Sequence, residues 1–179
     1  MPRLTLVGYR GTGKSTVAAL VAAGLGCDWC DADAVLEERL GVTIAALVRD
    51  RGEQAFRDAE AALLAELLAG FTGVLATGGG AVLRPENRLL LRRLGRPVAW
   101  LVAPADVVRA RLAADPATRD RRPALAGRDP LDEVADALTA REPLYREVAD
   151  TVVDATAAPA TVAARLLAWV RAPREGGGP

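Results

Sequence analysis

The sequence contains no histidine among its 179 residues. Histidine is the side chain that most often titrates near neutral pH, and it is the commonest metal ligand. Its absence excludes hydrolases that depend on a serine–histidine or cysteine–histidine arrangement. If the protein is an enzyme, its proton chemistry falls to carboxylates.

Lysine is nearly absent, and there is no net charge. The 23 basic residues are balanced by 23 acidic ones, and Lys14 is the only lysine. Proteins whose main partner is DNA or RNA carry an excess of basic charge, so we expect no nucleic-acid partner. Because arginine occupies every other basic position, Lys14 requires a specific explanation.

Only two cysteines occur, Cys27 and Cys30, in a C-x-x-C arrangement. This spacing can indicate a redox pair or half of a zinc site. Structural zinc needs four nitrogen or sulfur ligands, and the sequence has neither a histidine nor a further cysteine to complete the set. We interpret both cysteines as small apolar residues that pack near a strand, with a redox pair as the alternative.

Long apolar runs are also missing. No run approaches the ~20 residues that span a bilayer, and the N-terminus lacks the basic, apolar and small-residue order of a secretory signal. We therefore expect a cytoplasmic protein without a membrane partner. With 51% hydrophobic residues, the chain is expected to form a single domain over residues 1–172, followed by a disordered tail at 173–179.

Short apolar segments alternate with helical patterns along the chain. The predicted strands are 4–7, 29–31, 74–76, 97–102 and 151–153, and the predicted helices are 14–25, 34–40, 52–68, 85–94, 104–113, 131–148 and 160–170. The polar stretch 114–129 predicts a long mobile loop. Because parallel strands need helical crossovers, this order predicts an α/β fold with a five-stranded parallel sheet and helices on both faces.

The first predicted strand leads into a phosphate-binding motif. Gly8-Tyr-Arg-Gly-Thr-Gly-Lys14-Ser15 matches G-x-x-x-x-G-K-[ST] and precedes a predicted helix. Backbone N–H groups of such a loop surround nucleotide phosphates. Lys14 would reach the β- and γ-phosphates as a compact charge, for which arginine is a poor substitute. We expect ATP and Mg²⁺ contacts from Gly11, Thr12, Gly13, Lys14, Ser15 and Thr16.

Kinases, GTPases and mechanical ATPases all use such a loop. GTPases usually read guanine with an N-K-x-D motif, which is impossible here because Lys14 is the only lysine. Mechanical ATPases usually have a strand that ends in an aspartate for Mg²⁺, whereas the strand at 74–76 runs into Gly78-Gly79-Gly80. Both observations favour a small-molecule kinase.

Six short motifs extend from the phosphate loop almost to the C-terminus. They are residues 8–16, Asp31-Ala-Asp33, Gly52-Glu-Gln-Ala-Phe56-Arg57 with Glu60, Gly78-Gly79-Gly80, Arg122-Pro-Ala-Leu125 and Arg141-Glu-Pro-Leu-Tyr145-Arg146. In this order the chain resembles the shikimate kinase family, P-loop enzymes of aromatic amino acid biosynthesis that are built like the nucleoside monophosphate kinases. The resemblance implies transfer of the γ-phosphoryl group of ATP to the 3-hydroxyl of shikimate.

The resemblance also implies roles on the acceptor side. Arg57 and Arg141 would bind the shikimate carboxylate, Gly79 would contact shikimate through its backbone, and Asp33 would hydrogen-bond the hydroxyl that is phosphorylated. Considered alone, Asp33 could instead be a helix N-cap, and each arginine could be a solvated surface charge beside acidic neighbours.

On the nucleotide side, the resemblance places Asp31 near Mg²⁺ together with Ser15. It makes Arg122 a lid residue that closes over the phosphates from the loop at 114–129. Lys14, Asp33 and Arg122 would then be the catalytic residues. The segment 154–159 lacks the arginine before proline that the family often carries, so no adenine contact is assigned.

Two other functions remain open. Another small-molecule kinase, such as a gluconate kinase, would share the phosphate loop but present a different acceptor site. A non-catalytic nucleotide-binding module would retain the fold while regulating a partner. In each case a monomer is expected.

Overall fold

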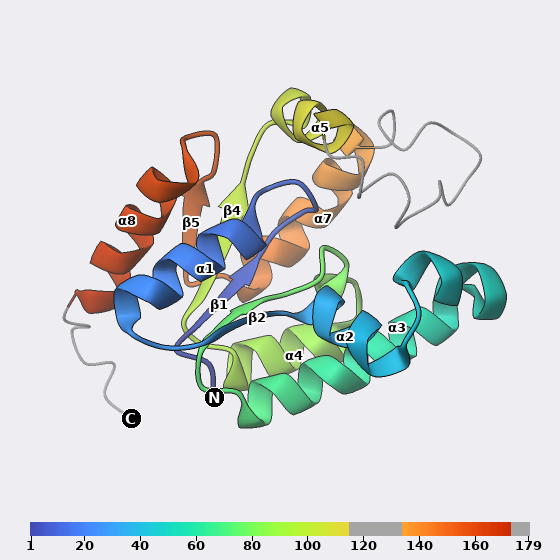
Figure 1. Cartoon of the computed structure of the whole chain (residues 1–179). Helices are drawn as coiled ribbons and strands as arrows, with labels where there is room; N and C mark the ends of the chain where they lie inside the picture. Colours follow the sequence, from blue (N-terminus) through green and yellow to red (C-terminus); the bar gives the residue numbers. More distant parts are fainter. Residues whose placement is uncertain (115–133, 173–179) are drawn as a thin grey trace.

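The computed structural model describes residues 1–114 and 134–172. Five strands form one parallel sheet in the order β2-β3-β1-β4-β5 (Figure 1). They are β1 (Leu4–Val7), β2 (Trp29–Asp31), β3 (Val74–Ala76), β4 (Val98–Val102) and β5 (Thr151–Asp154). The predicted sheet is confirmed. Apart from Ala114, the loop predicted at 114–129 lies outside the described residues, and so do Arg122 and the tail predicted at 173–179.

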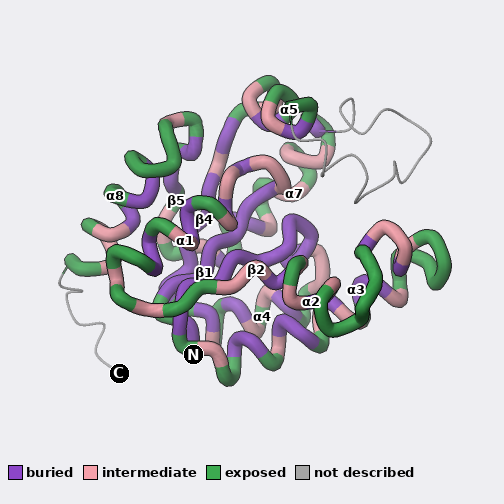
Figure 2. The backbone as a smooth tube through the Cα atoms, in the orientation of Figure 1, coloured by how far each residue is buried: buried purple, intermediate pink, exposed green. Residues whose placement is uncertain are grey.

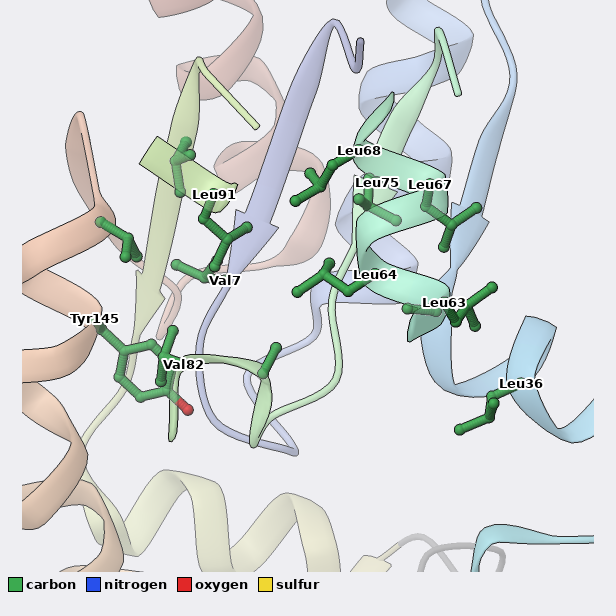
Figure 3. Close-up of a cluster of buried hydrophobic side chains, with 14 of the residues drawn as sticks. Val7, Leu36, Leu63, Leu64, Leu67, Leu68, Leu75, Val82, Leu91 and Tyr145 are labelled. Atoms are coloured by element: carbon green, nitrogen blue, oxygen red, sulfur yellow. The ribbon is translucent and has the colours of Figure 1, made fainter. Parts of the chain in front are cut away.

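Helices cover both faces of this sheet. On one face, α1 (Lys14–Leu25) and α8 (Pro159–Arg171) pack together over residues such as Leu4 and Leu6 of β1. The other face is covered by α3 (Ile44–Gly70), α4 (Pro85–Leu94) and α7 (Val134–Val148), which enclose the cluster in Figure 3. Since both faces are covered, the central strands are almost entirely apolar and buried (Figure 2).

The remaining helices lie beside the carboxyl ends of the strands. They are α2 (Ala32–Leu40), which contacts α3, and α5 (Ala105–Ala114), which contacts α7. A short 3₁₀ turn, η1 (Ala81–Leu83), follows the glycine triplet. Within residues 1–114 and 134–172, none of the helices combines the length and the apolar character that crossing a membrane requires.

The helix predicted at 52–68 corresponds to the part of α3 that follows a kink at Gly52, and the helical residues before the kink were not predicted. α3 begins at Ile44, where the Thr43 hydroxyl accepts a hydrogen bond from the Ala46 N–H at 3.1 Å and caps the N-terminus. Gly52 has φ 82° and ψ 164°, so the chain kinks there and then resumes the helix. Glycine is a typical helix boundary, which is why the sequence pattern suggested a start at 52.

Candidate active site

The phosphate loop connects β1 to α1 and is shaped by its glycines. Gly13, the N-cap of α1, has φ 86°, a left-handed conformation that L side chains rarely adopt. Lys14 opens α1 and is buried. Its ammonium group donates hydrogen bonds to the backbone oxygens of Gly8 at 2.8 Å and Tyr9 at 2.9 Å. The side chain of the only lysine in the sequence therefore reaches back to the first residues of the loop.

Ser15 and Asp31 meet beside this loop. The Ser15 hydroxyl, in the first turn of α1, donates to Asp31 Oδ2 at the end of β2. Asp31 Oδ1 accepts hydrogen bonds from the N–H groups of Asp33 at 2.9 Å and Ala34 at 3.3 Å. Asp31 is thus the N-cap of α2, and the interpretation of Asp33 as the cap is wrong. Asp33 lies within the first turn.

The Ser15–Asp31 pair fits a magnesium ion. Mg²⁺ prefers hard oxygen ligands, and it usually keeps several waters and takes only one or two ligands from the protein. A hydroxyl and a carboxylate beside a phosphate loop supply such a set. Within the described part of the chain there is no group of three or more histidine, cysteine, aspartate or glutamate residues that could hold a metal.

Carboxylates from two helices meet at the first glycine of the triplet. A methyl group placed on Gly78 would lie 2.5 Å from Asp33 Oδ1 and 2.6 Å from Glu60 Oε1. Asp33 comes from α2 and Glu60 from α3, and Glu60 is buried. The absence of a side chain at Gly78 therefore allows both carboxylates to approach the end of β3.

Arg57 is buried beside this pair, so its interpretation as a solvated surface charge is wrong. Its side chain is only 11% exposed, and its guanidinium pairs with Glu60 at 2.7 Å and with Glu53 at 3.2 Å. Burial opposes the charge, but both carboxylates outweigh it and raise the pKa of Arg57. A methyl group on Gly80 would collide with this guanidinium, which places Arg57 against the last glycine of the triplet.

Helix α7 supplies two side chains to the middle glycine. Arg141 Nη1 donates to the Gly79 carbonyl oxygen at 3.3 Å, and the Tyr145 hydroxyl donates to the same oxygen at 2.6 Å. Arg141 also lies over the ring of Tyr9 in the phosphate loop, 5.2 Å from its centroid. Burial raises the pKa of Tyr145, although the charge of Arg141 opposes this, so the phenol stays protonated and acts as a donor.

Sequence reasoning assigned no role to Tyr145. A signal was present, because Tyr145 follows Arg141 by four residues and such positions share one face of a helix. An aromatic residue one turn after a candidate substrate-binding arginine is expected beside it.

The two glycine-rich turns are in direct contact. A methyl group on Gly79 would lie 3.0 Å from the backbone nitrogen of Arg10 in the phosphate loop. The structure thus brings Lys14, Ser15, Asp31, Asp33, Arg57, Gly79 and Arg141 to the carboxyl ends of β1, β2 and β3. A nucleotide held by the first turn would lie beside a molecule held by the second.

The two cysteines take no part in this arrangement. Both are free and partly buried, and they pack against the clusters on opposite faces of the sheet. Burial, helped by the charge of Asp31, raises the pKa of Cys30 to about 11. Its thiol therefore stays protonated near neutral pH, in agreement with a packing role.

Comparisons with known proteins point to one family. The family model described as shikimate kinase matches residues 10–171. A curated shikimate kinase from Nitratidesulfovibrio vulgaris is 50% identical over 151 residues, which cover 84% of this chain and 85% of that protein. The solved structure of a shikimate kinase from Acinetobacter baumannii in complex with shikimate superposes with a TM-score of 0.85 at 35% identity, covering 93% of this chain and 91% of that one.

A gluconokinase from Sinorhizobium meliloti provides a contrast. It covers 93% of this chain and 90% of its own, but with a TM-score of 0.55 and 17% identity, so the likeness shows the shared fold alone. The match to shikimate kinases extends over most of the chain at far higher identity, and the chain belongs to the shikimate kinase family.

Proposed function

We propose that the protein transfers the γ-phosphoryl group of ATP to the 3-hydroxyl of shikimate, giving shikimate 3-phosphate and ADP. One observation carries this proposal. Two arginines from different helices converge on consecutive glycines, Arg57 at Gly80 and Arg141 at Gly79, and this glycine turn packs against the phosphate loop. A small carboxylate bound there would be held beside the phosphoryl donor.

Arginine suits the acceptor carboxylate because its planar fork makes two parallel, charge-assisted hydrogen bonds. The Glu60 and Glu53 carboxylates fix the guanidinium of Arg57 in place. The loss of side-chain freedom on binding is therefore small. Arg141 approaches the neighbouring Gly79 from α7 and would complete the recognition of the carboxylate.

Asp33 is the proposed group that orients and deprotonates the acceptor hydroxyl. It lies against Gly78, close to the buried carboxylate of Glu60. Kinases place a carboxylate at the acceptor hydroxyl in this way. The sequence has no histidine, so no imidazole competes for the role.

On the donor side, Lys14 would bind the β- and γ-phosphates, and Ser15 with Asp31 would hold Mg²⁺. Mg²⁺, when bound, neutralises charge that develops on the transferring group. The N–H groups of Gly11, Thr12, Gly13 and Thr16 would surround the phosphates. Arg122 is proposed as the lid arginine on the resemblance of its flanking sequence alone.

We propose that the protein acts as a monomer, with the substrate-binding residues supplied by its own phosphate loop and by α2, α3 and α7. A cytoplasmic location is proposed because ATP is supplied there.

The direct test is a coupled ADP-release assay with ATP and Mg²⁺. Its arms are no acceptor, shikimate, quinate and gluconate. ADP release that depends on shikimate is the expected result. Release with gluconate alone would mean that the acceptor site belongs to a different small-molecule kinase, and no stimulation by any acceptor would favour a non-catalytic nucleotide-binding module.

Asp33→Asn tests the acceptor chemistry. The substitution keeps the size of the side chain but removes its charge, so kcat should fall by about 10²–10⁴-fold, the usual contribution of a general base. Asp58→Asn is the matched control, since Asp58 lies on α3 with its side chain 60% exposed and paired to Arg84. Turnover by Asp33→Asn at the rate of this control would remove Asp33 from the mechanism.

A further inference from the structure

We propose that Tyr145 is a positioning residue for acceptor binding, because its hydroxyl holds the Gly79 carbonyl and leaves the Arg141 guanidinium available to the acceptor carboxylate. This inference rests on the proposed function.

The first observation is that one carbonyl receives two side-chain donors of unequal quality. The Tyr145 hydroxyl lies 2.6 Å from the Gly79 oxygen, a short O–H···O hydrogen bond. Arg141 Nη1 lies 3.3 Å from the same oxygen, beyond the usual range for N–H···O. Tyr145 therefore makes the main hydrogen bond to the Gly79 carbonyl oxygen, and Arg141 contributes a weak second bond.

The second observation is that Tyr145 is held rigidly. It is 1% exposed and stacks on Trp100 of β4, with ring centroids 5.7 Å apart and planes inclined by 17°. In Figure 3 its ring projects from α7 into the core beside Val82. Because the ring is fixed by the sheet and by the apolar cluster, its hydroxyl defines a fixed position for the Gly79 carbonyl.

The third observation concerns the place of Gly79 between the two proposed substrates. A methyl group placed on it would lie 3.0 Å from the backbone nitrogen of Arg10 in the phosphate loop, while its carbonyl accepts hydrogen bonds from α7. A rotation of this peptide would move the contact surface for the acceptor relative to the phosphate loop. Such a displacement would misalign the groups that bind the acceptor and so weaken its binding.

The hydrogen bond from Tyr145 also affects what Arg141 binds. Without the phenol, the buried Gly79 carbonyl would keep, among partners in the described residues, only its weak bond from Arg141. An under-satisfied buried carbonyl is unfavourable, so the guanidinium would move onto it and away from the acceptor. Tyr145 thus acts through Gly79 and Arg141 and does not itself touch the acceptor.

The test is Tyr145→Phe, which keeps the ring, its stacking on Trp100 and the core volume. The KM for shikimate, and its Kd measured by calorimetry without nucleotide, should rise about tenfold, the effect of one buried hydrogen bond. The KM for ATP and kcat should change less than about twofold. An unchanged shikimate Kd would overturn the proposal.

A double-mutant cycle with Arg141→Ala separates positioning from general packing. In the Arg141→Ala background, Tyr145→Phe should raise the KM for shikimate by less than about twofold, because the group it positions is gone. A full tenfold effect in that background would show that Tyr145 does not act through Arg141.

Thr77→Val is the matched control for loss of a buried hydroxyl. The Thr77 hydroxyl donates to the Leu6 carbonyl at 3.2 Å, and valine keeps the shape of the side chain. This variant should bind shikimate like the wild type. An equal loss of affinity in Thr77→Val and Tyr145→Phe would mean general destabilisation and contradict the proposal.

Failure of the proposed function would look different. In that case the wild-type protein itself would neither bind nor phosphorylate shikimate. Phosphorylation of shikimate by the wild type, with Tyr145→Phe unchanged, would overturn the positioning role alone.

Discussion

The two glycine-rich turns of the site use glycine for different reasons. In the phosphate loop, Gly13 has φ 86° and a methyl group placed on it would meet nothing within 4 Å. In the triplet, none of the glycines has a positive φ, yet a methyl group on Gly78 would lie 2.5 Å from Asp33 Oδ1. Gly13 of the first turn is therefore required for its backbone conformation, whereas the triplet requires glycine for space.

The backbone conformation of one turn is determined within its own segment, whereas the space at the other turn depends on residues that are distant in the sequence. The conformation of the phosphate loop belongs to one contiguous segment between β1 and α1. The space at the triplet is occupied by side chains from α2 and α3 and by the backbone of the phosphate loop. Two side chains of α7 donate hydrogen bonds to the Gly79 carbonyl. Changes in the first turn should therefore affect the nucleotide, and changes around the second should affect the acceptor, which the following substitutions test.

The largest effect is expected for Lys14→Ala. Removing the only ammonium group of the phosphate loop should lower kcat by about 10³-fold or more, because charge on the transferring phosphoryl loses its fixed counter-charge. Lys14→Met, which keeps the length of the side chain, should be equally inactive. Steady-state kinetics with a melting curve for each variant is the measurement, and turnover like the wild type in either one would contradict the assignment.

A smaller and more selective effect is expected for Arg57→Ala. Loss of a charge-assisted, two-pronged contact should raise the KM for shikimate about 100-fold and leave the KM for ATP nearly unchanged. Arg57→Lys keeps the charge without the planar fork and should recover only part of the affinity. If the KM values for shikimate and for ATP rose together, the assignment of the nucleotide to the first turn and of the acceptor to the second would be wrong.

The difference between local and distant contacts also explains which features can be predicted from the sequence. The phosphate loop and the five strands follow from contiguous patterns, whereas the placement of Asp31 near Ser15 is implied by the family resemblance. The burial of Arg57 could not be predicted from its acidic neighbours, because an ion pair such as Arg57–Glu60 looks the same in sequence whether it is exposed or buried. The spacing from Arg141 indicates that Tyr145 lies beside this arginine, but its hydrogen-bond partner could not be predicted, because that partner is a backbone carbonyl far away in the chain.

Gly78→Ala and Gly13→Ala test the two uses of glycine directly. In Gly78→Ala, the carboxylates of Asp33 and Glu60 are flexible ends that can move aside, so the fold should hold while kcat/KM for shikimate falls about tenfold. In Gly13→Ala, a left-handed conformation is imposed on alanine at about 1–2 kcal/mol. We expect a lower Tm and weaker nucleotide binding for Gly13→Ala, and a reversed pattern would contradict the interpretation of both turns.

The smallest effect is expected for Glu66→Gln. Glu66 pairs with Arg39 at 2.6 Å, about as short as the Arg57–Glu60 pair at 2.7 Å, but its side chain is 60% exposed whereas that of Glu60 is 5% exposed. Water and salt screen the exposed pair, so its loss should leave the Tm and the KM for shikimate unchanged within error. Glu60→Gln, by contrast, should lower the Tm and raise the KM for shikimate, because it leaves the buried guanidinium of Arg57 without its main counter-charge. If Glu66→Gln and Glu60→Gln changed the Tm and the KM for shikimate equally, burial would not be the reason why the ion pair in the site matters more than the ion pair on the surface.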